Sequence, residues 1–127
     1  MRRQKAMFNI DTLGSIIEQY TNMKHTKLKE AKSSAINHFY IELMGGDTGG
    51  SGKTVSEEYD ITILLNSYKD AFKEANDIQN IVYNINRAIK AQTSKLGVIS
   101  AGYEGFQKNI LGSITELRIN YTFEVLK

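Results

Sequence analysis

The sequence predicts an all-α protein, an elongated three-helix antiparallel bundle or coiled coil with a Gly-rich connection. Three observations lead to this fold class. The chain of 127 residues has no proline, the residue that most strongly breaks a helix. Its apolar residues recur at steps of three and four, which is helical spacing. Five of the ten glycines lie between Gly45 and Gly52, so the rest of the chain contains few helix breakers.

Length and composition exclude several classes of protein. A chain of 127 residues can build one core and is too short for two domains of usual size. Without cysteine it cannot form disulfides or hold zinc or iron–sulfur clusters through thiolates. The net charge of +2 does not by itself indicate a nucleic-acid partner. We find no secretory signal and no apolar stretch near the ~20 residues that span a bilayer, so we expect a cytoplasmic protein.

The first predicted segment covers residues 1–44, with a helix over 11–44 and Asp11 as its N-cap. Lys24 stands where an apolar residue is due, so this segment is either one helix or two that meet near residues 23–26. Residues 39–44 also allow a short strand. The apolar seam of this segment consists of Ile10, Leu13, Ile17, Tyr20, Leu28, Phe39 and Leu43.

Residues 45–53 have the composition of a flexible linker, either natural or introduced to join two polypeptides. The letters GSGKT at its end resemble the Walker A phosphate loop, a resemblance that implies phosphate contacts for Lys53 and a magnesium contact for Thr54. The first glycine of that motif is replaced by Asp47. The predicted helices also leave no parallel sheet to hold such a loop, so a nucleotide binder ranks third among the candidate functions.

The second large segment, residues 54–127, is predicted to be a long heptad-patterned helical hairpin with helices over 55–96 and 100–126. Thr54 and Glu57 form a capping box at its start. Glycines from Gly97 onward favour a turn between residues 96 and 103, although a straight helix stays open. The predicted seam is made of Ile61, Leu64, Tyr68, Ile78, Val82, Ile85, Ile89, Gln92, Leu96, Ile99, Tyr103, Phe106 and Ile110. This spacing is typical of a left-handed coiled coil, in which the polar Gln92 either sets the register or marks where the seam opens to solvent.

No residue pattern indicates catalysis, and we predict no catalytic residue, metal or cofactor. His25 lies in the stretch MKHTKLKEAKSSA, which resembles the phosphoacceptor region of histidine phosphotransfer domains, small helical bundles. Glu30 stands where that family has glycine. His25 and His38 have no carboxylate at a spacing that would complete a metal site. Helix capping explains the acidic residues Glu57, Glu58 and Asp60 without catalysis.

The predicted function is that of a non-enzymatic interaction or assembly subunit. Burial of the long apolar seam against copies of itself or helices of a partner protein would drive the association. We therefore expect an oligomer or a member of a larger complex. The alternative is a helical protein that binds nucleic acid through the basic residues Arg2, Arg3, Lys5, Lys24, Lys27, Lys29 and Lys32.

Overall fold

The computed structural model contains a five-stranded mixed sheet, so the prediction of an all-α bundle or coiled coil is wrong. It describes residues 8–21, 23–26, 38–46, 54–66, 75–112 and 114–126. The helices are α1 (Ile10–Thr21), α2 (Ala75–Ala91) and α3 (Thr93–Leu96), and the strands are β1 (Lys24–His25), β2 (His38–Gly46), β3 (Thr54–Asn66), β4 (Val98–Leu111) and β5 (Ile114–Leu126). The order of strands across the sheet is β1-β2-β3-β5-β4. Only β1 and β2 are parallel neighbours.

Strands β3 and β5 form the centre of the sheet because their apolar residues alternate with polar ones. On β5, Leu117, Ile119 and Tyr121 are buried, while Arg118 and Asn120 lie between them. Alternation with a period of two places the apolar side chains on one face of a strand. The two strands pair in antiparallel register from Thr54 opposite Leu126 to Asn66 opposite Ile114.

The coiled-coil prediction failed because an apolar-rich strand also satisfies helical spacing. In a strand, residues four apart lie on the same face. Because the chain is rich in apolar residues, an apolar residue is also found at the intervening steps of three, so the helical pattern is fulfilled by chance. The predicted seam included Ile61 and Leu64 and passed over Ile63 and Leu65, which are buried with Ile61. Ile61 and Ile63 are β-branched, a type of residue that favours strands.

The glycine-rich segment connects two paired strands in place of two helices. Gly45 and Gly46 belong to β2, which pairs in antiparallel fashion with β3 and has a bulge between Leu43 and Gly45. Thr54 and Glu57 lie in β3, so they do not cap a helix as predicted. Residues 47–53 lie outside the described residues, and whether this segment joins two polypeptides by design stays a prediction.

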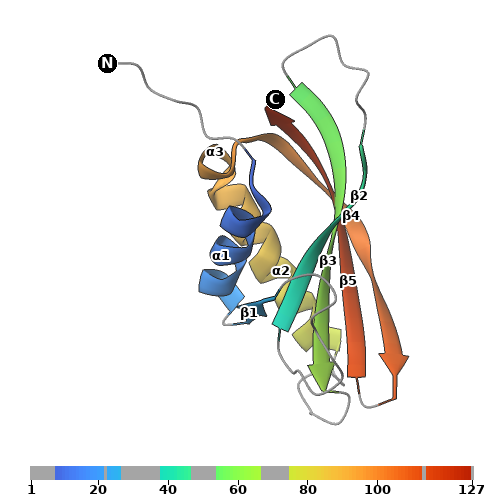
Figure 1. Cartoon of the computed structure of the whole chain (residues 1–127). Coiled ribbons are helices and arrows are strands. Elements are labelled where there is room, and N and C mark those ends of the chain that lie inside the picture. Colours follow the sequence, from blue (N-terminus) through green and yellow to red (C-terminus); the bar gives the residue numbers. More distant parts are fainter. Residues whose placement is uncertain are drawn as a thin grey trace.

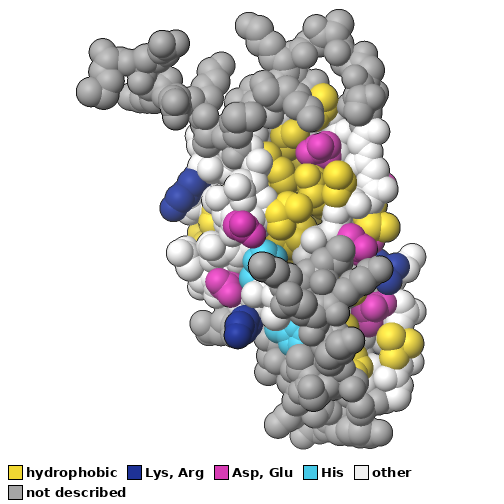
Figure 2. Space-filling view, in the orientation of Figure 1, with side chains coloured by type: hydrophobic (Ala, Val, Ile, Leu, Met, Phe, Trp, Pro, Cys, Tyr) yellow, Lys and Arg dark blue, Asp and Glu magenta, His cyan; other side chains and the backbone are white. Residues whose placement is uncertain are grey.

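Helices α1 and α2 cover one face of the twisted sheet, which we call the helix-bearing face (Figure 1). The largest fully buried side chains include Leu13 and Ile17 of α1, Ile85 and Ile89 of α2, and Phe39, Ile61, Leu117, Tyr121 and Phe123 of the sheet. Figure 2 shows hydrophobic side chains gathered where the helices meet the strands. The core therefore joins residues from both ends of the chain.

Within the described residues, helical spacing coincides with the two longer helices, α1 and α2. The N-cap of α1 is Asn9 and not Asp11 as predicted, since the Asn9 side-chain oxygen accepts a hydrogen bond from the Asp11 backbone N–H at 2.7 Å. The chain leaves the helical conformation at Gly97, whose φ of 74° is left-handed. Glycine adopts this conformation without steric cost, which lets the chain turn from α3 directly into β4.

Candidate functional site

Strand β4 is the most unusual surface of the described residues. It has 14 residues and stands last in the sheet, paired with β5 on one side only. Its side chains are mostly exposed, and five of the exposed ones are large and apolar: Ile99, Tyr103, Phe106, Ile110 and Leu111. Their exposed fractions run from 41% for Phe106 to 65% for Ile110. A long edge strand with exposed apolar side chains is a template for pairing with another chain.

The register with β5 shows which of these side chains share a face. Tyr103 lies opposite Tyr121, Phe106 opposite Ile119, and Ile110 opposite Thr115. Tyr121 and Ile119 belong to the core on the helix-bearing face, and the buried Thr115 lies on the same face by the alternation of side chains along β5. Tyr103, Phe106 and Ile110 therefore point to that face, at the margin of the core, and Lys108 lies between the last two opposite Leu117.

An aromatic row crosses the sheet and ends at this edge. Tyr59, Tyr121 and Tyr103 are neighbours in register on β3, β5 and β4. The ring centroids of Tyr103 and Tyr121 are 5.7 Å apart and tilted by 58°, a favourable edge-to-face arrangement. Tyr121 is held further by its hydroxyl, which donates a hydrogen bond to the Asn86 side-chain oxygen on α2. Its ring also stacks on Phe123. Tyr103 of β4 therefore packs against a tyrosine that the core and α2 hold in place.

A cavity of about 340 Å³ separates α2 from β4. Its walls come from Asn86, Ile89 and Lys90 on the helix and from Ala101, Tyr103 and Tyr121 on the sheet. The small side chain of Ala101 leaves this space open beneath α2. A space of this volume accepts a large apolar side chain or a small ligand.

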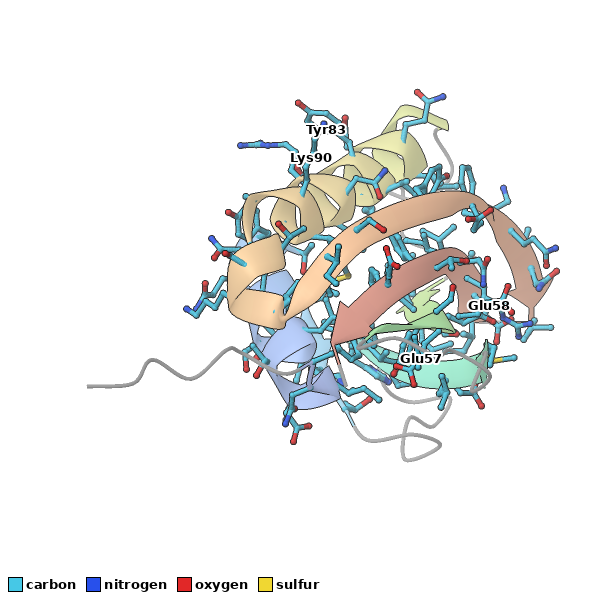
Figure 3. All side chains as sticks on the ribbon, turned by 90° about the horizontal axis from the view of Figure 1, so that it is seen from above. Glu57, Glu58, Tyr83 and Lys90 are labelled. Carbon is cyan, nitrogen blue, oxygen red and sulfur yellow. The ribbon has the colours of Figure 1, made fainter. Side chains whose placement is uncertain are left out.

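The basic groups near the edge have no acidic partner among the residues that the structure describes. Lys90 lines the cavity, Lys108 lies on β4, and Arg87 stands 5.7 Å from the centre of the Tyr83 ring. Tyr83 and Lys90 project from α2 on the side of the molecule away from Glu57 and Glu58 of β3 (Figure 3). Cationic side chains on this side are available to aromatic or acidic groups of a partner.

The opposite face of the sheet carries a polar network on β3 and β5. Asn120 donates a hydrogen bond to the buried Asp60 carboxylate at 2.9 Å, and Arg118 lies 3.9 Å from the same carboxylate. Arg118 also pairs with Glu116 at 3.2 Å. Next to this network, burial raises the pKa of Tyr40. A cavity of about 390 Å³ lies over Asp60, Arg118 and Asn120. These polar groups therefore have partners within the sheet itself.

The residues of the predicted long seam do not form one surface. Six of them lie in the core of the helix-bearing face: Ile61, Ile78, Val82, Ile85, Ile89 and Leu96. Four of them line β4: Ile99, Tyr103, Phe106 and Ile110. Leu64 is buried on the opposite face of β3, and Gln92 stands between α2 and α3. Tyr68 lies outside the described residues.

The residues of the predicted N-terminal seam are divided between a helix and a strand. Ile10, Leu13, Ile17 and Tyr20 pack from α1 onto the core. Phe39 is buried in β2, whereas Leu43 is exposed at the far end of that strand. Leu28 lies outside the described residues. The described residues do not form a single helical stripe, because β2 takes the place of the predicted helix from His38 onward.

The two stretches that resemble phosphate-handling motifs do not have the surroundings that those motifs require. The loop ending in GSGKT precedes a strand that begins at Thr54, so the helix N-terminus that a Walker A loop needs is missing. Lys53 lies outside the described residues. His25 lies in β1, where its ring stacks on Phe39 with centroids 5.2 Å apart, and not on a helix of a phosphotransfer bundle.

Most of the predicted basic interface lies outside the described residues. Of its seven residues only Lys24 lies within the described residues, exposed on β1. Arg2, Arg3, Lys5, Lys27, Lys29 and Lys32 lie outside them.

Sequence reasoning missed β4 as an edge strand. A signal was present in the stretch Tyr103-Glu-Gly-Phe-Gln-Lys-Asn-Ile110, because large apolar residues stand among glycine and polar residues, a mixture that suits neither a buried helix nor a buried strand. Within the described ranges, no helix is both long and apolar enough to cross a membrane. The same residues contain no group of three or more histidines and carboxylates that could hold a metal ion. No protein-family model and no curated protein matches this sequence.

Proposed function

We propose that this protein is a non-enzymatic assembly subunit that binds another polypeptide along the free edge of β4. The incoming chain would add a strand to the sheet. The observation that carries the proposal is the exposure of Tyr103, Phe106 and Ile110 on one face of a terminal strand of 14 residues. Strand addition uses the unpaired backbone groups of an edge for affinity and its side chains for specificity.

The proposed interface differs from the predicted helical seam in its geometry. Six of the thirteen residues of the long seam are buried in the core, so they are not available to a partner helix. The part that is left for a partner is the run from Ile99 to Ile110, and it is a strand. Burying its apolar side chains would contribute roughly 25 cal/mol for each Å² of apolar surface removed from water.

Site-specific photocrosslinking tests the proposal. A photoreactive phenylalanine analogue placed at position 110 of β4 should give a covalent adduct in the cells that produce the protein. The matched control is position 43, because Leu43 is similarly exposed but lies at the other side of the sheet. Adducts at 110 and not at 43 would support the proposal. Adducts at 43 alone, or at neither position, would contradict it.

A further inference from the structure

We infer that the polypeptide that binds β4 is a second copy of this chain, paired in antiparallel register about a twofold axis at Phe106. The inference rests on the proposed function, because it names the partner of the same edge. Its basis is that β4 is complementary to itself in the register centred on Phe106.

The register follows from the positions that β4 presents on the helix-bearing face. Pairing with β5 sets their order as Ala101, Tyr103, Phe106, Lys108 and Ile110, with a bulge between Tyr103 and Gly105. An antiparallel copy centred on Phe106 places the two Phe106 rings side by side. The same register sets Tyr103 beside Lys108 of the second copy and Ala101 beside Ile110 of the second copy. Residues on the same face of neighbouring strands contact each other directly.

Each of these pairs satisfies a group that is exposed in the single chain. Ile110, with 65% of its surface exposed, would enter the cavity that Ala101 leaves open beneath α2. The Lys108 ammonium would lie by the ring of Tyr103, which favours a cation–π contact. The two Phe106 rings would cover each other. Between the two β4 strands themselves no like charges face each other in this register, because Lys108 and Glu104 are the only charged residues of β4 and neither meets its own copy.

The arrangement of the helices is compatible with this pairing. Helix α2 approaches β4 at Ala101 and Tyr103, whereas the half of β4 from Phe106 to Leu111 is exposed. A twofold axis perpendicular to the sheet keeps the helices of both copies on one side and brings the uncovered half of each β4 under α2 of the other. The result is one continuous sheet of two copies, closed by its symmetry.

Pairing about Lys108, the next residue on the same face, would be less favourable. Shifting the axis to Lys108 would set Lys108 beside Lys108 of the other copy, and like charges directly opposite each other destabilise a strand pair. The self-complementary register is thus centred on Phe106 and not on its neighbour along the same face.

Disulfide trapping tests this register directly, because the chain has no cysteine of its own. Only a residue on the twofold axis meets its own copy, so a Phe106→Cys variant should form a covalent dimer on mild oxidation. Lys108→Cys and Ile110→Cys variants should stay monomeric on reducing-agent-free gels. The double variant Ala101→Cys with Ile110→Cys should form a covalent dimer again. Trapping through Lys108→Cys in place of Phe106→Cys would overturn the register.

Sedimentation velocity measures the association itself. The purified chain should dimerise, and Ile110→Lys should raise the dimer dissociation constant by about a hundredfold, roughly tenfold for each of the two symmetric contacts. Lys108→Arg should keep the dimer, whereas Lys108→Glu should weaken it by about tenfold. Lys24→Glu is the matched control, since Lys24 is exposed on β1 at the other edge of the sheet, and it should change nothing.

A monomer at every concentration, with thermal unfolding unchanged in all variants, would overturn the second copy as partner. The proposed function would survive that result if the photocrosslinked adduct at position 110 contained a different polypeptide. Absence of both the dimer and the adduct would remove the two proposals together.

Discussion

Gly14 shows how a single residue lets α1 lie close to the sheet. The His25 ring is packed between Gly14 and Phe39, with its centroid 5.2 Å from that of Phe39. A Cβ atom at position 14 would overlap the His25 imidazole. The Glu18 carboxylate accepts a hydrogen bond from the His25 backbone N–H at 2.8 Å, which fixes β1 beside the helix. The glycine is thus required for space and not for an unusual backbone angle.

We predict that Gly14→Ala lowers the free energy of unfolding by about 1–3 kcal/mol, because overpacking against His25 outweighs the better helix propensity of alanine. In a His25→Ala background the same change should instead raise it by up to about 1 kcal/mol, since only helix propensity is left. Urea unfolding of the four proteins in this double-mutant cycle measures both values. A destabilisation that persists without the His25 ring would contradict the explanation.

Two buried tyrosines should make stability depend on pH in alkaline solution. Burial raises the pKa of Tyr59, and so does the Glu57 carboxylate, which accepts a hydrogen bond from the Tyr59 hydroxyl. Burial and the neighbouring Tyr103 raise the pKa of Tyr121. Both stay protonated in the folded chain at a pH where the unfolded chain ionises them. Their contribution is complete below about pH 10 and is lost as the pH rises further.

The expected result is a free energy of unfolding that falls above about pH 10, by up to about 1.4 kcal/mol per pH unit for each tyrosine. The double variant Tyr59→Phe with Tyr121→Phe should show a smaller slope. Denaturant unfolding between about pH 8 and 11 provides the measurement. Equal slopes in the two proteins would show that these hydroxyls do not hold their protons in the folded state.

At the scale of elements, the polar face of β3 and β5 depends on one buried pair. Asp60 is 6% exposed, and its carboxylate accepts a hydrogen bond from Asn120. Asn109 makes a longer bond of 3.4 Å to Glu116 at the exposed margin of the same face. Each of the two asparagines therefore donates a hydrogen bond to a carboxylate, one at a buried position and one at an exposed position.

Asn120→Ala should lower the free energy of unfolding by about 1–3 kcal/mol, because it leaves the buried Asp60 carboxylate without its best donor. Asn109→Ala is the control and should cost less than about 0.5 kcal/mol at an exposed position. Thermal unfolding of both variants compares them. Equal destabilisation by the two variants would mean that burial does not determine how much these hydrogen bonds contribute to the free energy of unfolding.

The whole molecule is held together across the glycine-rich segment by long-range contacts. Strand β2 pairs with β3 from His38 opposite Leu64 to Gly46 opposite Glu57. Helix α1 belongs to the same core as α2. The part before residue 47 and the part after residue 53 therefore share one core, whatever the origin of the segment between them.

Cleavage at a protease site introduced within residues 47–53 should leave the two fragments associated in native buffer, because the β2–β3 pairing and the shared core are intact. They should separate only in denaturant. Size-exclusion chromatography before and after cleavage shows whether the two fragments elute together. Dissociation in native buffer would show that covalent linkage is needed to hold β2 on β3.

Some of this architecture could be predicted from local pattern. The helical spacing of Leu13 and Ile17, and of Ile85 and Ile89, coincides with α1 and α2. The same criterion misled along β3 and β5, where alternation of β-branched and aromatic residues was the stronger signal. A chain rich in apolar residues contains both the strand period of two and the helical spacing of three and four. Following the helical spacing therefore selected some apolar residues and passed over others that are buried beside them.

The sequence by itself determined the absence of thiol chemistry, the glycine-rich break in the chain, and the apolar faces of the two larger helices. Only the tertiary structure decided that β3 pairs with β5, that α1 and α2 cover one face, and that β4 is left at the edge. The physical reason is that strand pairing joins backbone groups far apart in the chain. Tyr59 and Tyr121 become neighbours only when the sheet forms, and so does the exposed row that ends at Tyr103.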